Sequence, residues 1–351
     1  MVDWDLAVTT GTRLVRPGPQ TTAAEARQVV TDLKSYAAQA NGHVAGFTGL
    51  HAPTDGSSVV VIDRPGWIQA NAAGFRTVLE PLVDKLQDRR KVSSPVGDAV
   101  GAKVTGVQTG SLLAFLATKV LGQYELFPPY GQDPGSRPGR LLLVAPNIVA
   151  AEQEMGVDPH DFRLWVCLHE ETHRVQFGAV PWLREHMMSE ISNFVEATDV
   201  DPDRLRSLLG DSLGEIVRVL RGDSESSLVE IVTNPEQREV IDSVTAVMSL
   251  LEGHADVVMD GVGPEVIPTV DTIRERFNRR RKGSSGLDQM LRRLLGLDIK
   301  MKQYAEGAVF VRGVVDAVGM TGFNAVWSSP EALPTRQEIL APATWVSRVH
   351  G

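Results

Sequence analysis

The segment from residue 164 to residue 177 carries two histidines and a glutamate at a spacing that suits metal chemistry. His169 and His173 are four residues apart, so a helix places them on one face, one turn apart, where both imidazoles can bind one zinc ion. Glu170 lies about 100° further around such a helix. It need not bind the metal, and it can instead take a proton from a water on the zinc, as a general base does in hydrolysis. The pattern therefore predicts a zinc site with Glu170 as the catalytic base.

The residues around this motif are mostly apolar, among them Trp165, Val166 and Leu168. We therefore expect the motif helix to be buried. Burying two histidines and a glutamate together is costly unless they are paired or bind a metal. The alternative to a metal site is a hydrogen-bonded polar cluster within a helical core. Cys167 lies on the same helix, and we expect it to be an inert core thiol rather than a nucleophile.

A catalytic zinc ion usually has three protein ligands, so a third one is needed. The best candidate is Glu252, within the stretch from residue 247 to residue 260, which is apolar almost all round and therefore predicts a central helix. On that helix Glu252 falls within an apolar stripe formed by Ile241, Thr245, Met248, Ala255 and Met259. A carboxylate in such a stripe needs a positive partner, which zinc would supply. We expect one zinc ion, bound by His169, His173 and Glu252.

Three further side chains enter this hypothesis. Asp256 lies one turn after Glu252, so it can accept a hydrogen bond from the outer nitrogen of His169 or His173 and fix its tautomer. His254 is a less favoured third ligand, because it points to another side of the helix, and a core histidine with a local partner also explains it. His186 is a weaker alternative, and an exposed helix position also explains it.

The elements that position these residues are predominantly helical by their apolar periodicity. We expect helices after Thr22, from Gly66 to Arg90 with a possible kink at Pro81, and from Ala99 to Leu121. Two short β-rich runs, residues 58–63 and 140–145, can pair as a small sheet. Further helices are expected to begin near Pro159, Pro181, Pro202, Pro235, Pro268, Gly286 and Asp298. The tail from Ser328 to Gly351 carries three prolines, and we expect it to be extended over the body of the protein.

Composition limits the class of protein. The chain has 351 residues, of which 42% are hydrophobic and 23% charged, which is typical of a globular protein with a sizeable core. We expect an N-terminal region, residues 1–150, and a helical core, residues 151–351, within one integrated domain. A net charge of -9 makes nucleic acid and anionic membranes poor partners.

The single cysteine excludes an internal disulfide bond and fits a reducing compartment. The N-terminus has no basic segment followed by an apolar one, so we expect no signal peptide. No apolar run approaches the roughly 18 residues of a membrane helix. The expected location is the cytoplasm, and the oligomeric state is left open.

With these residues in view, the sequence resembles the zincin metallopeptidase superfamily, through its His169-to-His173 motif, the later Leu-Glu-Gly-His-Ala-Asp stretch and the preceding strand. It is also similar to an actinobacterial group of zincin-like proteins, some labelled as associated with biosynthesis of a deazaflavin coenzyme and others as proposed hydrolases. The similar stretches are residues 139–147, 169–177, 251–260, 302–307 and 333–335. The resemblance implies a mostly α-helical α+β fold, with a small sheet and a central motif helix. It implies His169, His173 and Glu252 as ligands and Glu170 as the base.

These observations favour a zinc hydrolase of the metallopeptidase type, in which activated water attacks an amide carbonyl of a peptide or small amide. Tyr304 and Arg312 are weak candidates for stabilising the oxyanion, and a solvated face or a structural hydrogen bond explains each of them better. The alternative is a non-catalytic protein that keeps the zincin scaffold for a structural or partner-binding role. An open space beside Glu170 would favour the enzyme.

Overall fold

The computed structural model of the protein describes residues 2–52, 59–88, 95–126, 139–197, 235–282 and 297–351. The chain divides into two compact units. Unit 1 comprises Met1–Ala179 and Val258–Arg276, and unit 2 comprises Val180–Val257 and Phe277–Gly351. Helices predominate and a small sheet is present, so the expected mostly helical α+β class is confirmed. The expected division near residue 150 stays a prediction.

The sheet belongs to unit 1 and has the strand order β1-β3-β2. β1 (Val59–Ile62) pairs in parallel with β3 (Arg140–Val144), which confirms the expected pairing of the two β-rich runs. β2 (Gly122–Glu125) pairs antiparallel with β3, with Tyr124 opposite Leu141. The sequence did not predict β2, because Gly-Gln-Tyr-Glu lacks the apolar run that marked the other two strands.

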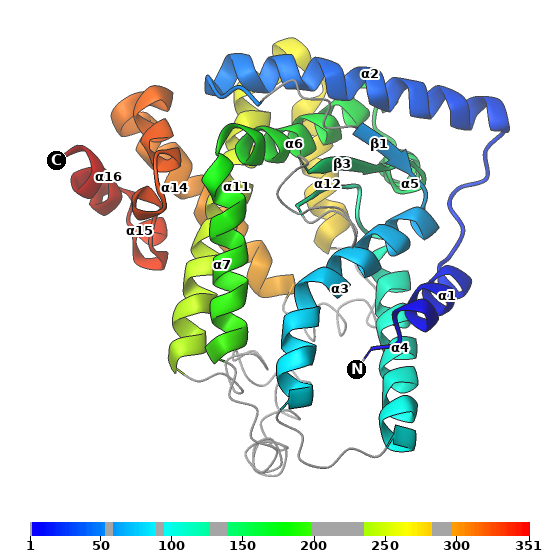
Figure 1. Cartoon of the computed structure of the whole chain (residues 1–351). Helices are drawn as coiled ribbons and strands as arrows, with labels where there is room; N and C mark the ends of the chain where they lie inside the picture. Colours follow the sequence, from blue (N-terminus) through cyan, green and yellow to red (C-terminus); the bar gives the residue numbers. More distant parts are fainter. Residues whose placement is uncertain (1, 53–58, 89–94, 127–138, 198–234, 283–296) are drawn as a thin grey trace. The chain divides into compact units, whose positions relative to one another are not determined.

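Helix α2 (Ala23–Thr48) packs against the motif helix, α6 (Pro159–Ala179), as Figure 1 shows. α2 begins at Thr22 in a capping box, in which Thr22 and Glu25 each satisfy a backbone N–H of the other. Its buried positions recur every three to four residues: Val29, Leu33, Ala37, Ala40 and Val44. This periodicity gives α2 one apolar face, and that face is the one that can cover α6.

An ionic cluster connects α6 to its neighbours. Arg163 of α6 donates two hydrogen bonds to Glu152, 2.9 and 2.6 Å long, and a third to Asp32 of α2 at 2.9 Å. Glu152 lies at the end of α5 (Ala145–Met155). Burial raises the pKa of Glu152, and Arg163 partly opposes this effect. The cluster fixes α6 relative to α2 and α5.

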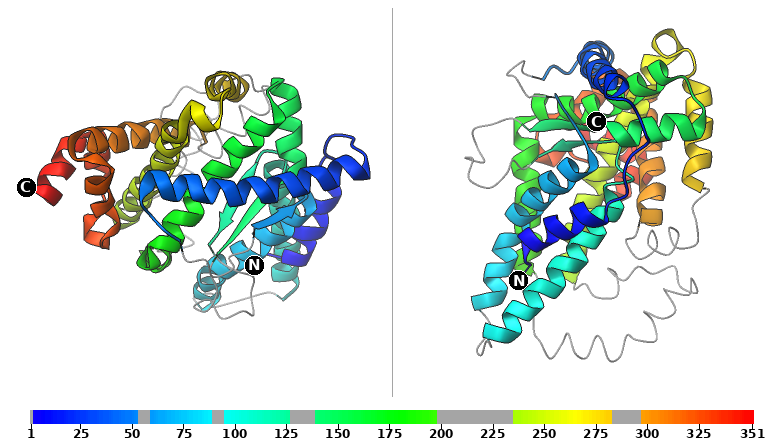
Figure 2. Two further views of the ribbon diagram at one scale, coloured as in Figure 1. Left: turned by 90° about the horizontal axis from the view of Figure 1, so that it is seen from above. Right: turned by 90° about the vertical axis from the view of Figure 1, so that its right-hand side faces the viewer.

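Three further helices of unit 1 are α1 (Trp4–Leu14), α3 (Arg64–Asp88) and α4 (Pro95–Leu116). Figure 2 shows α1 lying against α4. Their core includes Trp67, Ile68, Ala72, Leu113, Ala117 and Val144. α3 agrees with its expected range to within two residues and includes Pro81. α4 ends at Leu116, before the expected Leu121, and the chain then turns into β2.

A buried polar contact joins these helices to the sheet. Asn147 lies in the first turn of α5, which follows β3, and donates hydrogen bonds to the carbonyls of Ala117 and Val120. It accepts a third from Arg64 at the start of α3, 2.6 Å long. Each partner of Asn147 is distant in sequence, so these bonds hold the ends of α3, α4 and β3 together.

The remaining helices follow the expected starts closely. They are α7 (Pro181–Ala197), α11 (Pro235–Val266), α12 (Val270–Lys282) and α14 (Leu297–Phe323). The starts expected near Pro159, Pro181 and Pro235 are confirmed, and those near Pro268 and Asp298 are correct within two residues. The starts expected at Pro202 and Gly286 lie outside the described residues.

The expectation of an extended tail is wrong. After the short helices η1 (Asn324–Trp327) and η2 (Pro330–Ala332), the chain forms α15 (Arg336–Leu340) and α16 (Pro342–His350). Pro330 and Pro342 occupy first turns, where a missing N–H costs nothing, so they start helices instead of preventing them. Trp345 is fully buried, and its indole N–H donates to the carbonyl of Ala332, 2.8 Å away.

One described stretch, Ala305–Trp327, is long and apolar enough to cross a membrane by length and composition alone. Core helices of soluble proteins pass the same test, so this is weak evidence. Gly319 interrupts the helical backbone within the stretch, with φ 72° and ψ 171°. The expected cytoplasmic location stays a prediction.

Candidate metal centre

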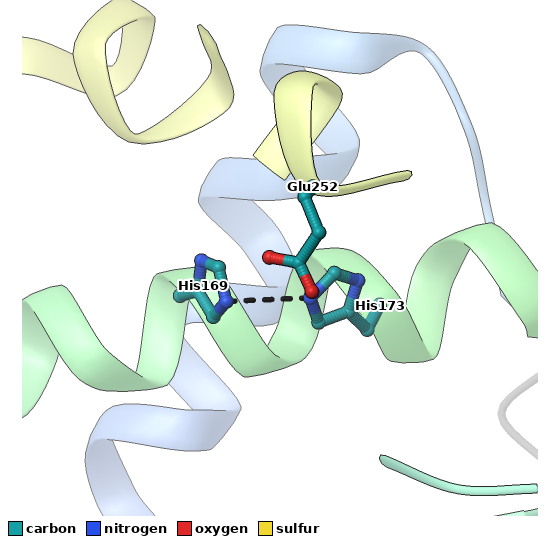
Figure 3. Close-up of side chains that lie close together, drawn as sticks. All are labelled: His169, His173 and Glu252. Carbon is teal, nitrogen blue, oxygen red and sulfur yellow. Dashed lines mark hydrogen bonds between the residues drawn. The ribbon is translucent and has the colours of Figure 1, made fainter. Parts of the chain in front are cut away.

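The motif histidines are half-buried positions on one face of a mostly buried helix. α6 starts where the Asp158 carboxylate accepts the backbone N–H of Asp161, 3.0 Å away, and Pro159 occupies its first turn. His169 and His173 are half-buried, and their rings are 4.8 Å apart and nearly perpendicular. Their Nε2 atoms are 3.3 Å apart (Figure 3). The helix thus presents two imidazole nitrogens to the same point.

The spacing of these nitrogens fits zinc. Two nitrogen ligands about 2.0–2.1 Å from a tetrahedral zinc ion are about 3.3 Å apart. The distance between Nε2 of His169 and Nε2 of His173 has this value before any movement of the side chains. Imidazole nitrogen is also among the donors that zinc prefers. The residues present therefore fit the metal that the sequence predicts.

Glu252 of α11 lies close to both histidines. One ligand atom from each of the three side chains can be chosen so that all lie within 4.8 Å of one another. Figure 3 shows the Glu252 carboxylate directed toward the imidazoles. Within α11, Val258 and Met259 follow Glu252 by less than two turns and are buried in unit 1, and Gly261 lies against the Phe47 ring. Two imidazoles and one carboxylate form a donor set typical of catalytic zinc.

Gln176 is a site residue that the sequence analysis missed. Its Oε1 atom is 2.9 Å from Nδ1 of His173, and the residue is 0% exposed. An amide oxygen only accepts hydrogen bonds, so Nδ1 of His173 must carry the proton. In a neutral imidazole this leaves the lone pair on Nε2, the nitrogen that faces His169. The position three residues after His173 on the same helix could have indicated this contact.

Glu170 lies against the edge strand. It is 6% exposed, and a Cβ atom added to Gly122 of β2 would lie 2.6 Å from its Cδ and 2.7 Å from its Oε1. Only a residue without a side chain at position 122 therefore leaves room for this carboxylate. Because β2 was not predicted, neither was the role of Gly122.

Asp256 forms an ion pair within unit 2, and its expected contact with a motif histidine stays a prediction. Its Oδ2 atom is 3.5 Å from a guanidinium nitrogen of Arg312 of α14, and the two side chains are 40% and 46% exposed. Nδ1 of His173 already has Gln176 as its hydrogen-bond partner. Of the two histidines, only His169 can therefore donate the hydrogen bond expected for Asp256. Arg312 thus has an acidic partner on α11, while the side chain of Tyr304 lies outside the described residues, and both stay candidates only.

The alternative ligands lie elsewhere among the described residues. His254 is fully buried and packs on Phe323, with ring centroids 5.3 Å apart. His186 of α7 lies near the Trp182 ring, at 6.1 Å. Neither joins the group formed by the motif histidines and Glu252.

Glu171 and Cys167 lie on the side of α6 that faces α2, where they contact Asn41 and the carbonyl of Leu33. Glu171 is 1% exposed and accepts a hydrogen bond 2.6 Å long from Nε of Arg174. Burial raises the pKa of Glu171, and Arg174 and Asn41 partly oppose this effect. Cys167 is buried on this side, where burial and the two neighbouring glutamates raise the pKa of its thiol. This environment fits the expected inert thiol.

A second acidic group lies at the start of α6. Asp158, His160 and Asp161 are close enough to offer ligand atoms to one ion. However, Asp158 caps the helix, and the two oxygens of Asp161 accept bonds from His160 and from the backbone and hydroxyl of Thr269. Hydrogen bonding therefore accounts for this group.

Comparisons with known proteins identify the family of the chain. A family model described as zincin-like metallopeptidase matches residues 2–346. Among solved structures, the chain is similar to a proposed hydrolase with a novel fold from Chloroflexus aurantiacus, with 31% sequence identity and a TM-score of 0.72 over 100% of this chain and 99% of that chain. The comparison with curated proteins gave no match. The expected superfamily resemblance is confirmed, and the narrower actinobacterial group stays a prediction.

Proposed function

Because the chain belongs to the zincin-like metallopeptidase family, we propose that it is a zinc-dependent hydrolase that cleaves an amide bond in a peptide or small amide. The observation that carries this proposal is the 3.3 Å separation of the Nε2 atoms of His169 and His173, with a carboxylate of Glu252 close by. His169, His173 and Glu252 would hold one zinc ion. When bound, zinc supplies Lewis-acid polarisation of the carbonyl and makes water a better nucleophile.

The remaining residues of the site would transfer the proton of the attacking water and orient the histidine ligands. Glu170 accepts the proton of the attacking water on its carboxylate, and it returns a proton to the leaving amine. Gly122 leaves the space in which that carboxylate lies. Gln176 holds the proton of His173 on Nδ1, so that Nε2 is available as a ligand.

The narrower similarity is part of the proposal. Residues 139–147 and 251–260 support placement among the actinobacterial zincin-like proteins that are labelled as deazaflavin-associated. Stretch 139–147 includes β3, and stretch 251–260 includes Glu252. The proposed substrate remains an amide or a peptide.

Elemental analysis of the purified protein tests the metal. We expect about one zinc per chain in the wild type and in His160→Ala, a control that removes another histidine from α6. His173→Ala should lose the metal, because a site with two protein ligands binds zinc much more weakly. Full zinc content in His173→Ala would contradict the proposed ligands.

Glu170→Gln tests the reaction. Glutamine keeps the shape of the side chain but cannot accept the proton, so zinc content should be unchanged. Hydrolysis of a peptide library, measured by mass spectrometry with and without a chelator, should fall by at least ~10²-fold. A wild-type rate in zinc-loaded Glu170→Gln would contradict the proposed mechanism.

A further inference from the structure

An aromatic pair lies beside the candidate metal centre. Tyr124 of β2 and Phe177 of α6 are stacked, with ring centroids 5.6 Å apart and planes inclined by 12°. Both residues are half-buried, so part of each is accessible to solvent. Neither residue is needed for metal binding or for proton transfer in the proposed function.

The helix places Phe177 next to the catalytic residues. Phe177 follows His173 by four residues, which is one turn of α6, or about 5–6 Å along its axis. Viewed along the axis, it lies about 80° from His169, between His173 at about 40° and Glu170 at about 100°. Phe177 therefore extends the face of α6 that carries the motif.

The alternation of side chains along β2 is a second reason to place Tyr124 beside the motif face of α6. Gly122 lies against Glu170, and Tyr124 follows it by two residues, so both face α6 about 7 Å apart. Gln123 between them faces the opposite side, where it accepts a hydrogen bond 3.0 Å long from Nε1 of Trp67. The pair is thus one step along β2 from the carboxylate of the proposed base.

The tyrosine ring is held in place. A Cβ atom added to Gly139 would lie 2.5 Å from Cζ and 2.6 Å from the hydroxyl oxygen of Tyr124. The outer end of the ring therefore lies over the chain just before β3, while Phe177 covers one of its faces. A ring fixed in this way loses little conformational freedom when a ligand packs on it.

We propose that the Tyr124–Phe177 pair determines specificity by binding an aromatic or large aliphatic side chain next to the scissile amide. This inference rests on the proposed function and defines its substrate class further. Apolar and aromatic groups gain most from such a surface, because their burial on it removes both surfaces from water. Substrates with glycine or a charged residue at that position would gain little.

Ligand binding tests this inference without turnover. The probes are acetohydroxamate and 3-phenylpropanohydroxamate, which share a zinc-binding group and differ in the phenyl side chain. Calorimetry on zinc-loaded protein should give a preference for the phenyl ligand of about tenfold or more in the wild type. Phe177→Ala and Tyr124→Ala should abolish most of this preference, while acetohydroxamate binding and zinc content stay the same.

Two controls sharpen the result. Tyr124→Phe keeps the ring and should keep the preference. Tyr36→Ala also removes a tyrosine that packs on α6, through His160 near its first turn, and should have no effect on the preference. If Phe177→Ala does not fold, Phe177→Leu keeps apolar bulk and should lower the preference for the phenyl ligand over its cyclohexyl analogue.

The outcomes separate the two proposals. Equal binding of both hydroxamates to the wild type, or a preference that survives Phe177→Ala and Tyr124→Ala, would overturn the role of the aromatic pair and leave the zinc site intact. Absence of acetohydroxamate binding to zinc-loaded wild type would overturn the proposed function, and the inference with it.

Discussion

Gly122 and Glu170 are in direct contact, although one lies on the edge strand and the other on the motif helix. The space that a Cβ at position 122 would need is filled by the Cγ, Cδ and Oε1 atoms of Glu170. The position of the proposed base therefore depends on a residue 48 positions earlier in the chain, since 170 - 122 = 48.

We predict that Gly122→Ala displaces the Glu170 carboxylate without affecting the metal. A shift of about 1 Å in a catalytic group can lower a rate by ~10²-fold, so hydrolysis should fall by roughly this factor at unchanged zinc content. Steady-state kinetics and elemental analysis measure the two quantities. Gly42→Ala is the matched control, because nothing lies within 4 Å of its added Cβ. Undiminished turnover in Gly122→Ala would show that this contact does not position the base.

Gln176→Met should weaken zinc binding. Methionine has a similar shape but cannot accept the Nδ1 proton of His173, and loss of such partners lowers metal affinity by roughly 10–100-fold. Gln176→Glu keeps an acceptor and should bind zinc as tightly as the wild type or more tightly. Competition with a chromogenic chelator measures both affinities. Equal affinities in the Met and Glu variants would exclude this role for Gln176.

Asp256→Asn distinguishes two roles for this carboxylate. If Asp256 orients His169, as the sequence predicts, the variant should lose roughly 10–100-fold in zinc affinity. If it acts only through the ion pair with Arg312, zinc affinity should not change and stability should fall by at most about 1 kcal/mol, since both side chains are well exposed. Arg312→Gln removes the same ion pair and serves as the control. An unchanged affinity in both variants would remove Asp256 from the site.

The ion pair between Glu338 and Arg348 should make stability depend on pH. Burial alone would raise the pKa of Glu338, but hydrogen bonds from Arg348 and Thr335 outweigh it and lower the pKa. A lowered pKa in the folded state contributes stability above the pKa of the unfolded state, and this stability is lost as the pH falls through the folded value. A double-mutant cycle with Glu338→Gln and Arg348→Gln, followed by chemical denaturation, should give a coupling of about 1 kcal/mol near pH 7.

The same cycle should give a smaller coupling at about pH 3, where more of Glu338 is protonated. A coupling that is constant between these two pH values would mean that the carboxylate charge does not contribute. The arginine retains its bonds to the carbonyls of Glu331 and Leu333 in either case, so the end of the chain should stay folded.

The predictions of the site from sequence rest on patterns within single helices. The spacing of His169 and His173 is a local property, and so is the apolar stripe around Glu252. Gly122 could not be found in this way, because its contact with Glu170 depends on how β2 packs on α6. The ion pair between Asp256 and Arg312 could not be found from helix phase either, because it depends on how α14 packs on α11.

The C-terminal tail shows how one local signal, its prolines, led to a wrong prediction of extended structure. The prolines of the tail suggest an extended chain, yet Pro330 and Pro342 each occupy a first turn. The capping box of Thr335 and Glu338 was a usable signal for α15. The burial of Trp345 is a tertiary property, and it decides that this segment packs as helices.

The parallel pairing of β1 with β3 has a consequence for the order of folding. Val59 is paired with Leu141, so the sheet closes a loop of 82 positions, since 141 - 59 = 82. Contacts between such distant residues form slowly, because the entropy of loop closure is lost before the contacts stabilise the chain. An isolated α6 peptide would carry both histidines without the strand that packs on Glu170. Competence for catalysis should therefore arise late in folding, after the chain has joined its distant segments.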